Sequence, residues 1–295
     1  MVEFKASSLC DVIKISTFAE KSLYCIYKAK YQEKILNRPV SKIFWFCLIC
    51  LVLLSSCQKS SENIYLHYLG HSAVYLDFGH EISVLCDYGN ENAYLEWAWD
   101  SPIFEAGSQA DIMCYSHFHA DHFDSLRAAN FSSIKLSGKI DTVISSLHIS
   151  SIPSSEKDIS RYDNYSFLFE YKGKKVLHLG DCQADIMTIN DPAHAWNISK
   201  RYPKESDILI MPIQGRMKYT LQAWKFAELL SPRSLLPTHY WSLESKDEFL
   251  DIMMTEGIKG KTIKIVNRGR ANYKYKSAGK NKMLILNLSP GKRKG

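Results

Sequence analysis

The sequence predicts an α/β (α+β) fold from the order of its strand-like and helix-like runs. Three β-rich runs separated by turn signals predict an opening meander of antiparallel strands: Ile64 to Leu69, Ala73 to Phe78 and Ile82 to Asp87. Helix-like runs interrupt the later strand-like ones, and Leu221 to Leu230 carries an apolar face at helical spacing. The chain has 295 residues, 46% of them hydrophobic, which suffices for a substantial core.

The later elements are also predicted from the spacing of apolar residues, which differs between helices and strands. Thr220 is a plausible N-cap for the helix at Leu221 to Leu230, because a threonine hydroxyl can accept a bond from the first turn. Asp121 is expected to begin a helix that continues from Phe123 to Asn130. The remaining expected strands and helix are Thr142 to Ile144, Leu147 to Ile149, Tyr165 to Tyr171, Lys175 to Leu179, Asp207 to Met211, Ser234 to Tyr240, Lys246 to Thr255 (the helix), Ile263 to Ile265 and Met283 to Leu288.

Residues 1–57 are expected to be an N-terminal extension and a lipoprotein signal peptide. The unbroken apolar run from Ile43 to Leu54 follows Lys42; it is shorter than the roughly 20 residues of a bilayer span and typical of a signal peptide. Leu54-Ser55-Ser56-Cys57 resembles the lipobox of bacterial lipoproteins. This resemblance implies cleavage before Cys57, a lipid on that cysteine, and a bacterial cell-envelope location at the periplasmic face or outer membrane.

Two interpretations of residues 1–42 stay open. Lipoprotein signals have short basic starts, and no methionine other than Met1 occurs before Met113, so a later start would need a non-standard codon such as that of Val40. The segment is either untranslated or a cytoplasmic extension, and an uncleaved membrane anchor or hydrophobic helix is the alternative to a cleaved signal. Residues 58–63 would tether a domain at 64–288, and residues 289–295 would fray.

Charge and cysteine usage exclude two classes of protein. The net charge of +6 comes mostly from the termini, and the domain mixes basic with acidic residues, so no nucleic-acid partner is expected. Five of the eight cysteines precede residue 58. The remaining three, Cys86, Cys114 and Cys182, predict no disulfide framework.

The chemistry-bearing stretch is His117-Phe118-His119-Ala120-Asp121-His122, directly after the strand-like run Ile112 to Tyr115. Side chains alternate along a strand, so His117 and His119 point the same way and could bind one metal ion. If a helix follows, Asp121 and His122 project toward a second ion about 3.5–4 Å from the first. A cluster of surface or core histidines is the alternative, although packing alone does not require this pattern.

This motif resembles that of the metallo-β-lactamase superfamily, and the resemblance extends from about Ile64 to about Asn287. It implies a four-layer αββα sandwich with metal ions at one edge. Leu-Gly-His-Ser-Ala-Val before a strand ending in Asp87 is similar to the opening of the ascorbate-6-phosphate-lactonase-like branch, whereas Tyr88 stands where proline is frequent. The resemblance implies seven ligands: His117, His119 and His148 on one ion, Asp121, His122 and His239 on the other, and Asp181 between them.

Three of these ligands depend on shorter motifs. Gly180-Asp181 ends a hairpin, and Pro-Thr-His-Tyr ending at Tyr240 resembles the family's Pro-x-His element, which supplies His239. The third ligand of the first ion is either His148 or His178. His148 is favoured because it precedes Asp181 by about the family's spacing, while His178 would face away from Asp181 in an extended run.

A ligand set of imidazoles and carboxylates suits zinc, with manganese and iron as alternatives. Two cations bridged by Asp181 would hold a hydroxide that attacks an ester, lactone, amide or phosphodiester, and catalytic Asp121 would orient it and carry a proton. The sequence has no Gly-x-Ser-x-Gly nucleophile motif. The partner would be a small-molecule substrate. Candidates for binding an anionic group on it are Gln214, Arg216, Lys218 and Tyr219. The alternative function is a lipid-anchored binding protein without turnover.

Overall fold

The first expected strands form an antiparallel meander in the computed structural model. β1 (Ile64–Gly70) pairs with β2 (Ala73–Phe78), and β2 pairs with β3 (Ile82–Cys86). The structure describes residues 62–90, 93, 109–131, 134–213, 217–268 and 272–288, which all belong to a unit spanning 60–295. The apolar run at 43–54, Cys57 and the expected frayed tail lie outside the described residues.

The first sheet has six strands in the order β13-β1-β2-β3-β4-β5. β4 (Ile112–Tyr115) and β5 (Ile134–Ser137) extend it in parallel from β3, and β13 (Asn272–Lys274) closes the other edge. Every residue of β3 and β4 is buried. Strands covered on both faces need no alternation of polar residues, which explains the uninterrupted apolar runs in the sequence.

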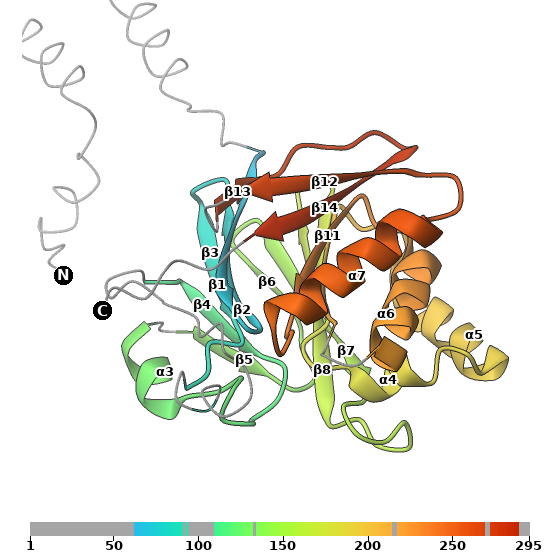
Figure 1. Cartoon of the computed structure of the whole chain (residues 1–295). Coiled ribbons are helices and arrows are strands. Elements are labelled where there is room, and N and C mark those ends of the chain that lie inside the picture. The colour runs from blue at the N-terminus through green and yellow to red at the C-terminus, as the bar shows by residue number, and fades with distance from the viewer. Residues whose placement is uncertain are drawn as a thin grey trace, which may run out of the picture. The chain divides into compact units, whose positions relative to one another are not determined.

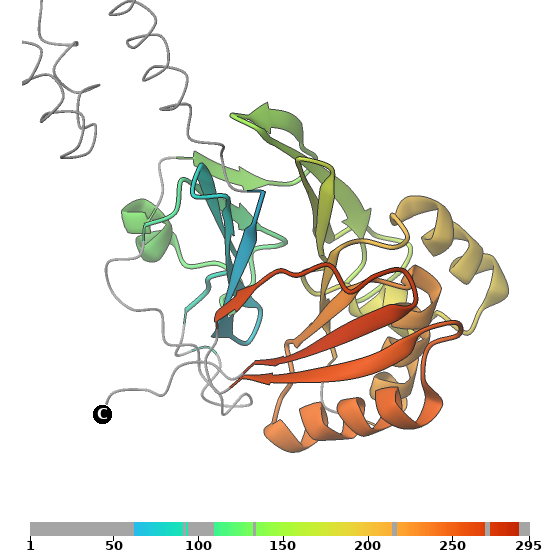
Figure 2. The same cartoon turned by 90° about the horizontal axis from the view of Figure 1, so that it is seen from above.

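The second sheet has eight strands in the order β12-β14-β11-β10-β9-β8-β7-β6. Its strands are β6 (Asp141–Ile144), β7 (Leu147–Ser154), β8 (Asn164–Tyr171), β9 (Lys174–His178), β10 (Ile208–Pro212), β11 (Ser234–Thr238), β12 (Thr262–Arg268) and β14 (Lys282–Leu288). From β6 to β9 the neighbours are antiparallel, and from β9 to β12 they are parallel. Figure 2 shows this sheet beside the first one.

Helices flank the two sheets on their outer sides (Figure 1). The described helices are α3 (Ser125–Phe131), α4 (Gln183–Met187), α5 (Pro192–Arg201), α6 (Met217–Leu230) and α7 (Leu243–Glu256). In Figure 1, α3 lies beside the first sheet and the other four lie beside the second. No helix within the described part of the chain combines the length and apolar character that crossing a bilayer requires.

Two helix starts differ from the sequence prediction. The helix after the histidine motif begins at Ser125, because the Asp124 carboxylate accepts the N–H groups of Leu126 and Arg127, so Asp121 lies in a turn ahead of it. α6 begins before Thr220, which therefore lies inside the helix and is not its N-cap.

Two apolar clusters define the layers. The larger cluster joins Val84 and Cys114 of the first sheet to Phe169 of the second, and it continues to Phe226 in α6 and Phe249 in α7. The smaller cluster joins the opposite face of β3 and β4, including Met113, to Ala128 in α3. The order is therefore helix, sheet, sheet, helix, which confirms the expected αββα sandwich. Cys86, Cys114 and Cys182 are buried free thiols.

Candidate metal centre

The candidate centre is built from residues that directly follow strands. The turn between β1 and β2 supplies His71, the loop after β4 supplies the histidine motif, and the loops after β9 and β11 supply Asp181 and His239. Together they form three overlapping groups in which the ligand atoms lie within 4.8 Å of one another. The members are His71, His117, His119, Asp121, His122, Asp181 and His239.

The Asp121 carboxylate lies at the middle of the largest group. Its Oδ2 atom is 3.0 Å from His71 Nε2, 3.3 Å from His122 Nε2 and 3.5 Å from His239 Nε2. Ligand atoms about 2.0–2.2 Å from a tetrahedral zinc ion are about 3.3–3.6 Å apart. Four buried donors at this spacing therefore fit a shared cation.

The first two motif histidines also turn one ring nitrogen toward the centre. His117 Nδ1 is hydrogen-bonded to Ser116 Oγ at 3.0 Å, and its buried Nε2 has no hydrogen-bond partner. His119 Nδ1 faces inward, while its Nε2 lies 3.5 Å from Lys157 Nζ on the exposed side. A buried imidazole nitrogen without a hydrogen bond is costly, and a metal ion would satisfy it.

Asp87 orients the histidine motif through the His122 ring nitrogen that does not face the centre. Its Oδ2 accepts a hydrogen bond from His122 Nδ1 at 3.0 Å, and its two carboxylate oxygens accept the N–H and Oγ–H of Ser116 at 2.7 Å each. A carboxylate on the far nitrogen fixes the ring so that Nε2 faces the metal. Burial would raise the pKa of Asp87, but His122 lowers it below its usual range, so Asp87 stays ionised.

Burial holds two of the histidines in the neutral form that binds metals. Burial lowers the pKa of His71 to about 3 and that of His117 to about 2. Burial would raise the pKa of Asp121, but hydrogen bonds from its histidine neighbours hold it well below its usual range. Burial would lower the pKa of His122, but Asp87 and Asp121 raise it well above its usual value, so His122 would release a proton when a cation binds.

Two glycines let the backbones of these loops approach each other. Gly180 has φ +63°, and a Cβ there would lie 2.3 Å from Ser116 Cβ, so a glycine is needed where these two loops approach. A Cβ on Gly89 would lie 2.2 Å from the carbonyl carbon of Asp121. Neither position can accept a larger residue without displacing the motif.

Asp181 adjoins both sides of the centre. It belongs to one group with His117 and His122, and its Oδ2 lies 3.6 Å from His239 Nε2. Gln183 Nε2 donates to the same oxygen at 2.9 Å. This is the position that a carboxylate shared by two cations requires.

The structure does not bring His148, the expected third ligand of the first ion, to the centre. His148 lies on β7 with Nδ1 3.0 Å from Glu170 Oε2 and Nε2 2.7 Å from Asp141 Oδ1, and it joins none of the groups. The alternative, His178, accepts the Gly180 N–H and donates to the Ser72 carbonyl. β7 continues well past His148, so the loop that reaches the centre comes later in the chain.

Sequence reasoning missed two buried residues at the centre. His71 was assigned only to a turn, although an imidazole between two apolar strands was a usable signal. Glu156 follows the end of β7, and its Oε2 lies 3.4 Å from His119 Nδ1 and 3.9 Å from His117 Nε2. Burial, and then the charge of Asp181, raise the pKa of Glu156 to about 7. No local sequence pattern distinguishes Glu156 from an ordinary acidic residue in a loop.

The structure describes the side chain of only one of the four expected substrate residues. Gln214 and Arg216 lie outside the described residues, the side chain of Lys218 is not described, and Tyr219 is buried in α6. A hollow of about 460 Å³ includes Glu156, Lys157 and Gln183 in its lining, which contains none of the seven residues of the ligand groups.

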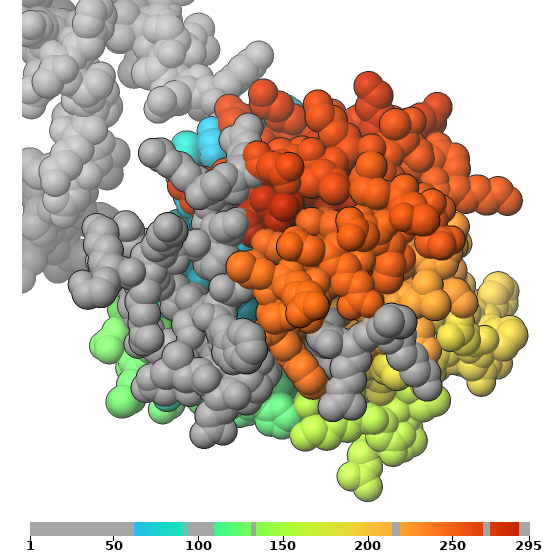
Figure 3. Space-filling model, in the orientation of Figure 1, coloured from blue at the N-terminus to red at the C-terminus, as the bar shows by residue number. Residues whose placement is uncertain are grey.

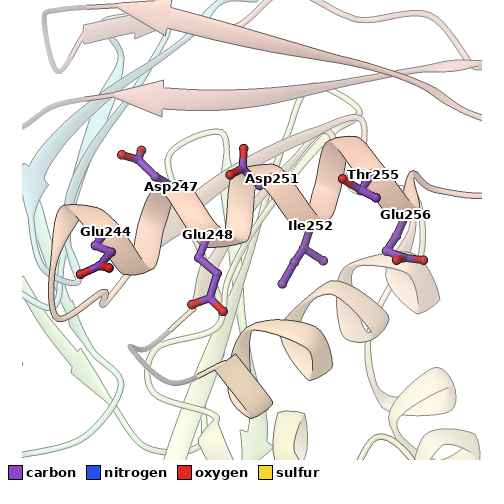
Figure 4. Close-up of a pocket in the computed structure, with 7 residues that line it drawn as sticks. All are labelled: Glu244, Asp247, Glu248, Asp251, Ile252, Thr255 and Glu256. Atoms are coloured by element: carbon purple, nitrogen blue, oxygen red, sulfur yellow. The ribbon is translucent and has the colours of Figure 1, made fainter.

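A separate hollow of about 430 Å³ lies along α7, the helix whose orange atoms form part of the face in Figure 3. Its lining comes from this one helix and is mainly acidic (Figure 4). None of the lining residues belongs to the metal-ligand groups among the described residues. We interpret this surface as the solvent-exposed face of an amphipathic helix.

Comparison with known proteins identifies relatives of the fold. A family model described as a beta-lactamase superfamily domain matches residues 65–239. A structure from Thermotoga maritima, assigned to the zinc-dependent hydrolases of the metallo-β-lactamase superfamily, is 19% identical, covers 76% of this chain and 99% of its own, and has a TM-score of 0.51. A structure from Parabacteroides distasonis, assigned as a metal-dependent hydrolase, is 21% identical, covers 66% and 90%, and has a TM-score of 0.49.

A metallo hydrolase from Ignicoccus hospitalis is 17% identical, covers 72% of this chain and 99% of its own, and has a TM-score of 0.49. A search of curated proteins finds no match. The likeness to the Thermotoga maritima structure, at 19% identity, shows a common fold alone, so the chemistry has to be argued from the side chains at the centre.

Proposed function

Because the chain belongs to the metallo-β-lactamase superfamily, we propose that it is a metal-dependent hydrolase acting on a small-molecule ester, lactone or phosphodiester-type substrate. The observation that carries the proposal is the Asp121 carboxylate with three imidazole nitrogens within 3.5 Å of one oxygen. A pure binding module has no use for so many buried metal-ligand side chains at the end of several strands.

Two divalent ions are the proposed cofactors, with zinc first and manganese or iron as alternatives. His117 and His119 would hold the first ion, Asp121, His122 and His239 the second, and Asp181 would lie between them. His71 belongs to the same group as the second set. Bound divalent cations lower the pKa of water by several units and stabilise negative charge on the attacked group.

The protein's own part in the reaction centres on Asp121. Its Oδ2 lies at the middle of the group, where it would orient the attacking water and carry a proton from it to the leaving group. His71 Nε2, 3.0 Å away, holds this oxygen in place. Asp87 keeps His122 in the orientation that the centre requires.

The hollow of about 460 Å³ lined in part by Glu156 supports a small-molecule substrate, since it is within the size range of ligand pockets. Lys157, on its rim, lies beside His119 and would attract an anionic group. We retain Gln214, Arg216, Lys218 and Tyr219 as further substrate contacts, and resemblance to the ascorbate-6-phosphate-lactonase-like branch favours a lactone or phosphate ester.

A substrate screen tests the proposal. The purified domain is assayed with chromogenic phosphodiesters, lactones and β-lactams, with and without added zinc or manganese. We expect turnover that chelation abolishes and metal restores, and a kcat lowered about 100-fold or more in Asp121→Asn. Turnover surviving complete metal removal would overturn the mechanism. Absence of turnover in a metal-loaded sample would favour the alternative, a lipid-anchored binding protein.

We also propose export and lipid anchoring at Cys57, on the strength of the apolar run and the Leu-Ser-Ser-Cys order. The domain would then stand at the bacterial cell envelope, tethered by the polar residues after Cys57. Expression with labelled fatty acid decides this. A processed, labelled product from Cys57→Ser would refute the anchor, whereas loss of both label and processing supports it.

A further inference from the structure

We propose that Glu156 is the third protein ligand of the first metal ion, in the place where a third histidine was expected. This inference rests on the proposed metal centre and assigns one more residue to it. The first site would then consist of two imidazoles and a carboxylate, with Asp181 shared between the ions.

The main chain fixes Glu156 beside the centre. Its N–H donates to Asp163 Oδ1 at 2.7 Å, and its carbonyl accepts the N–H of Ala184 at 2.9 Å. Ala184 lies in α4, which begins directly after the loop that carries Asp181. The loop after β7 is therefore tied to the loop after β9, and Glu156 cannot leave the centre without breaking both contacts.

Glu156 is not a member of the three ligand groups, but its side chain lies beside two residues that are. Its Oε2 lies 3.4 Å from His119 Nδ1 and 3.9 Å from His117 Nε2. Donors on one tetrahedral zinc ion are about 3.3–3.6 Å apart, so a small adjustment would place all three atoms around one cation. His117 Nε2 and His119 Nδ1 are the ring nitrogens that face the centre.

An ordinary ion pair does not account for this burial. Glu156 has a side-chain exposure of 9%, and the one lysine or arginine paired with it among the described residues is Lys157, whose side chain is 68% exposed. That contact involves Oε1 at 3.6 Å, whereas Oε2 points to the histidines. A solvent-exposed lysine contributes little to offset a buried carboxylate, whereas a divalent cation bound directly to it would contribute far more.

The assignment predicts a metal preference. Three imidazoles suit zinc, while carboxylate oxygens suit manganese, and two imidazoles with one carboxylate also hold iron(II). Glu156 should therefore shift the first site toward manganese or iron relative to a site with three histidines. Replacing Glu156 with histidine should reverse that shift.

The test measures metal binding, not turnover. Manganese and zinc are titrated separately into the metal-free full domain by calorimetry, with elemental analysis of the ions retained, for wild type, E156Q and E156H. The control is E170Q, because Glu170 also contacts a histidine ring, at 3.0 Å from His148 Nδ1, outside the centre.

We expect wild type to bind two ions and E156Q to keep one while binding the other about tenfold or more weakly. E156H should favour zinc over manganese more than wild type does, and E170Q should match wild type. E156Q affinities within about threefold of wild type for both ions would overturn the assignment.

A second measurement does not depend on any variant folding. In a crystal of the wild-type domain grown with manganese, a Glu156 oxygen at about 2.0–2.4 Å from the ion supports the assignment, and one beyond about 4 Å overturns it. Metal-loaded wild type without turnover would defeat the proposed hydrolase and leave Glu156 as a ligand. Wild type that bound neither manganese nor zinc would overturn both proposals.

Discussion

The partners of each imidazole decide which histidines can bind metal. His122 uses one nitrogen for Asp87 and turns the other to the centre, whereas both nitrogens of His148 are bonded to carboxylates on neighbouring strands. A sequence shows a histidine and its spacing, but it does not show which partners occupy its two nitrogens. The two sets of contacts therefore predict opposite results: replacing Asp87, the partner of His122, should weaken metal binding, and replacing His148 should leave it unchanged.

Replacing Asp87 should weaken metal binding without removing a ligand. In Asp87→Asn the His122 ring loses its charged partner, and the affinity for zinc should fall about 10–100-fold. Competition with a chelator of known affinity measures it. The matched control is Asp111→Asn, since Asp111 holds the N–H and Oγ–H of Ser83 as Asp87 holds those of Ser116. An equal loss of affinity in both variants would contradict the orienting role.

Replacing His148 should affect stability and leave metal content unchanged. Hydrogen bonds to Asp141, and then to Glu170, raise the pKa of His148, so its protonated ring stabilises the fold below the unfolded pKa and loses this effect as pH rises through the folded pKa. The side chain is 36% exposed, so the gain is only about 0.2–1 kcal/mol. The deficit in Tm of His148→Gln should be larger at about pH 5.5 than at about pH 8.5. A larger deficit at the higher pH would contradict the assignment.

The elements of the meander were predictable because their signals are local. The strand Ala73 to Phe78 was predicted with its observed bounds, since alternation and the flanking turns define it. The histidine motif was predictable for the same reason. The loop that carries Glu156 was not, because its place depends on how far β7 extends and on what its end packs against. β5 and β13 were missed because each is an edge strand of only four or three residues, too short for an alternating pattern to be distinctive.

The close approach of the loops after β4 and β9 predicts that replacing Gly180 destabilises the fold. An alanine there would clash with Ser116 and adopt a left-handed backbone, so Gly180→Ala should lower the free energy of unfolding by about 2–4 kcal/mol. Gly138 has φ +75° with nothing within 4 Å of its Cβ position, so Gly138→Ala isolates the backbone cost of about 1 kcal/mol. Urea unfolding of both variants measures the difference. Equal losses would show that the close contact contributes nothing.

At the scale of the whole molecule, metal removal should lower thermal stability. A ligand that binds only the folded state stabilises it by about 2.7 kcal/mol at a hundredfold excess over Kd, so two ions contribute about 5 kcal/mol. For a domain of this size that corresponds to about 10 °C or more in Tm. Calorimetry with and without a chelator checks this. An unchanged Tm would mean that the groups around Asp121 do not hold metal.

The main-chain bond from the His239 N–H to the His71 carbonyl joins one sheet to the other. The two residues lie far apart in the chain, so the centre exists only after both sheets have closed on each other. Joining distant segments costs chain entropy before their contacts are gained, so we expect the centre to form after the transition state. Metal ions would then leave the folding rate nearly unchanged and slow unfolding, so their main effect would be on the lifetime of the folded domain.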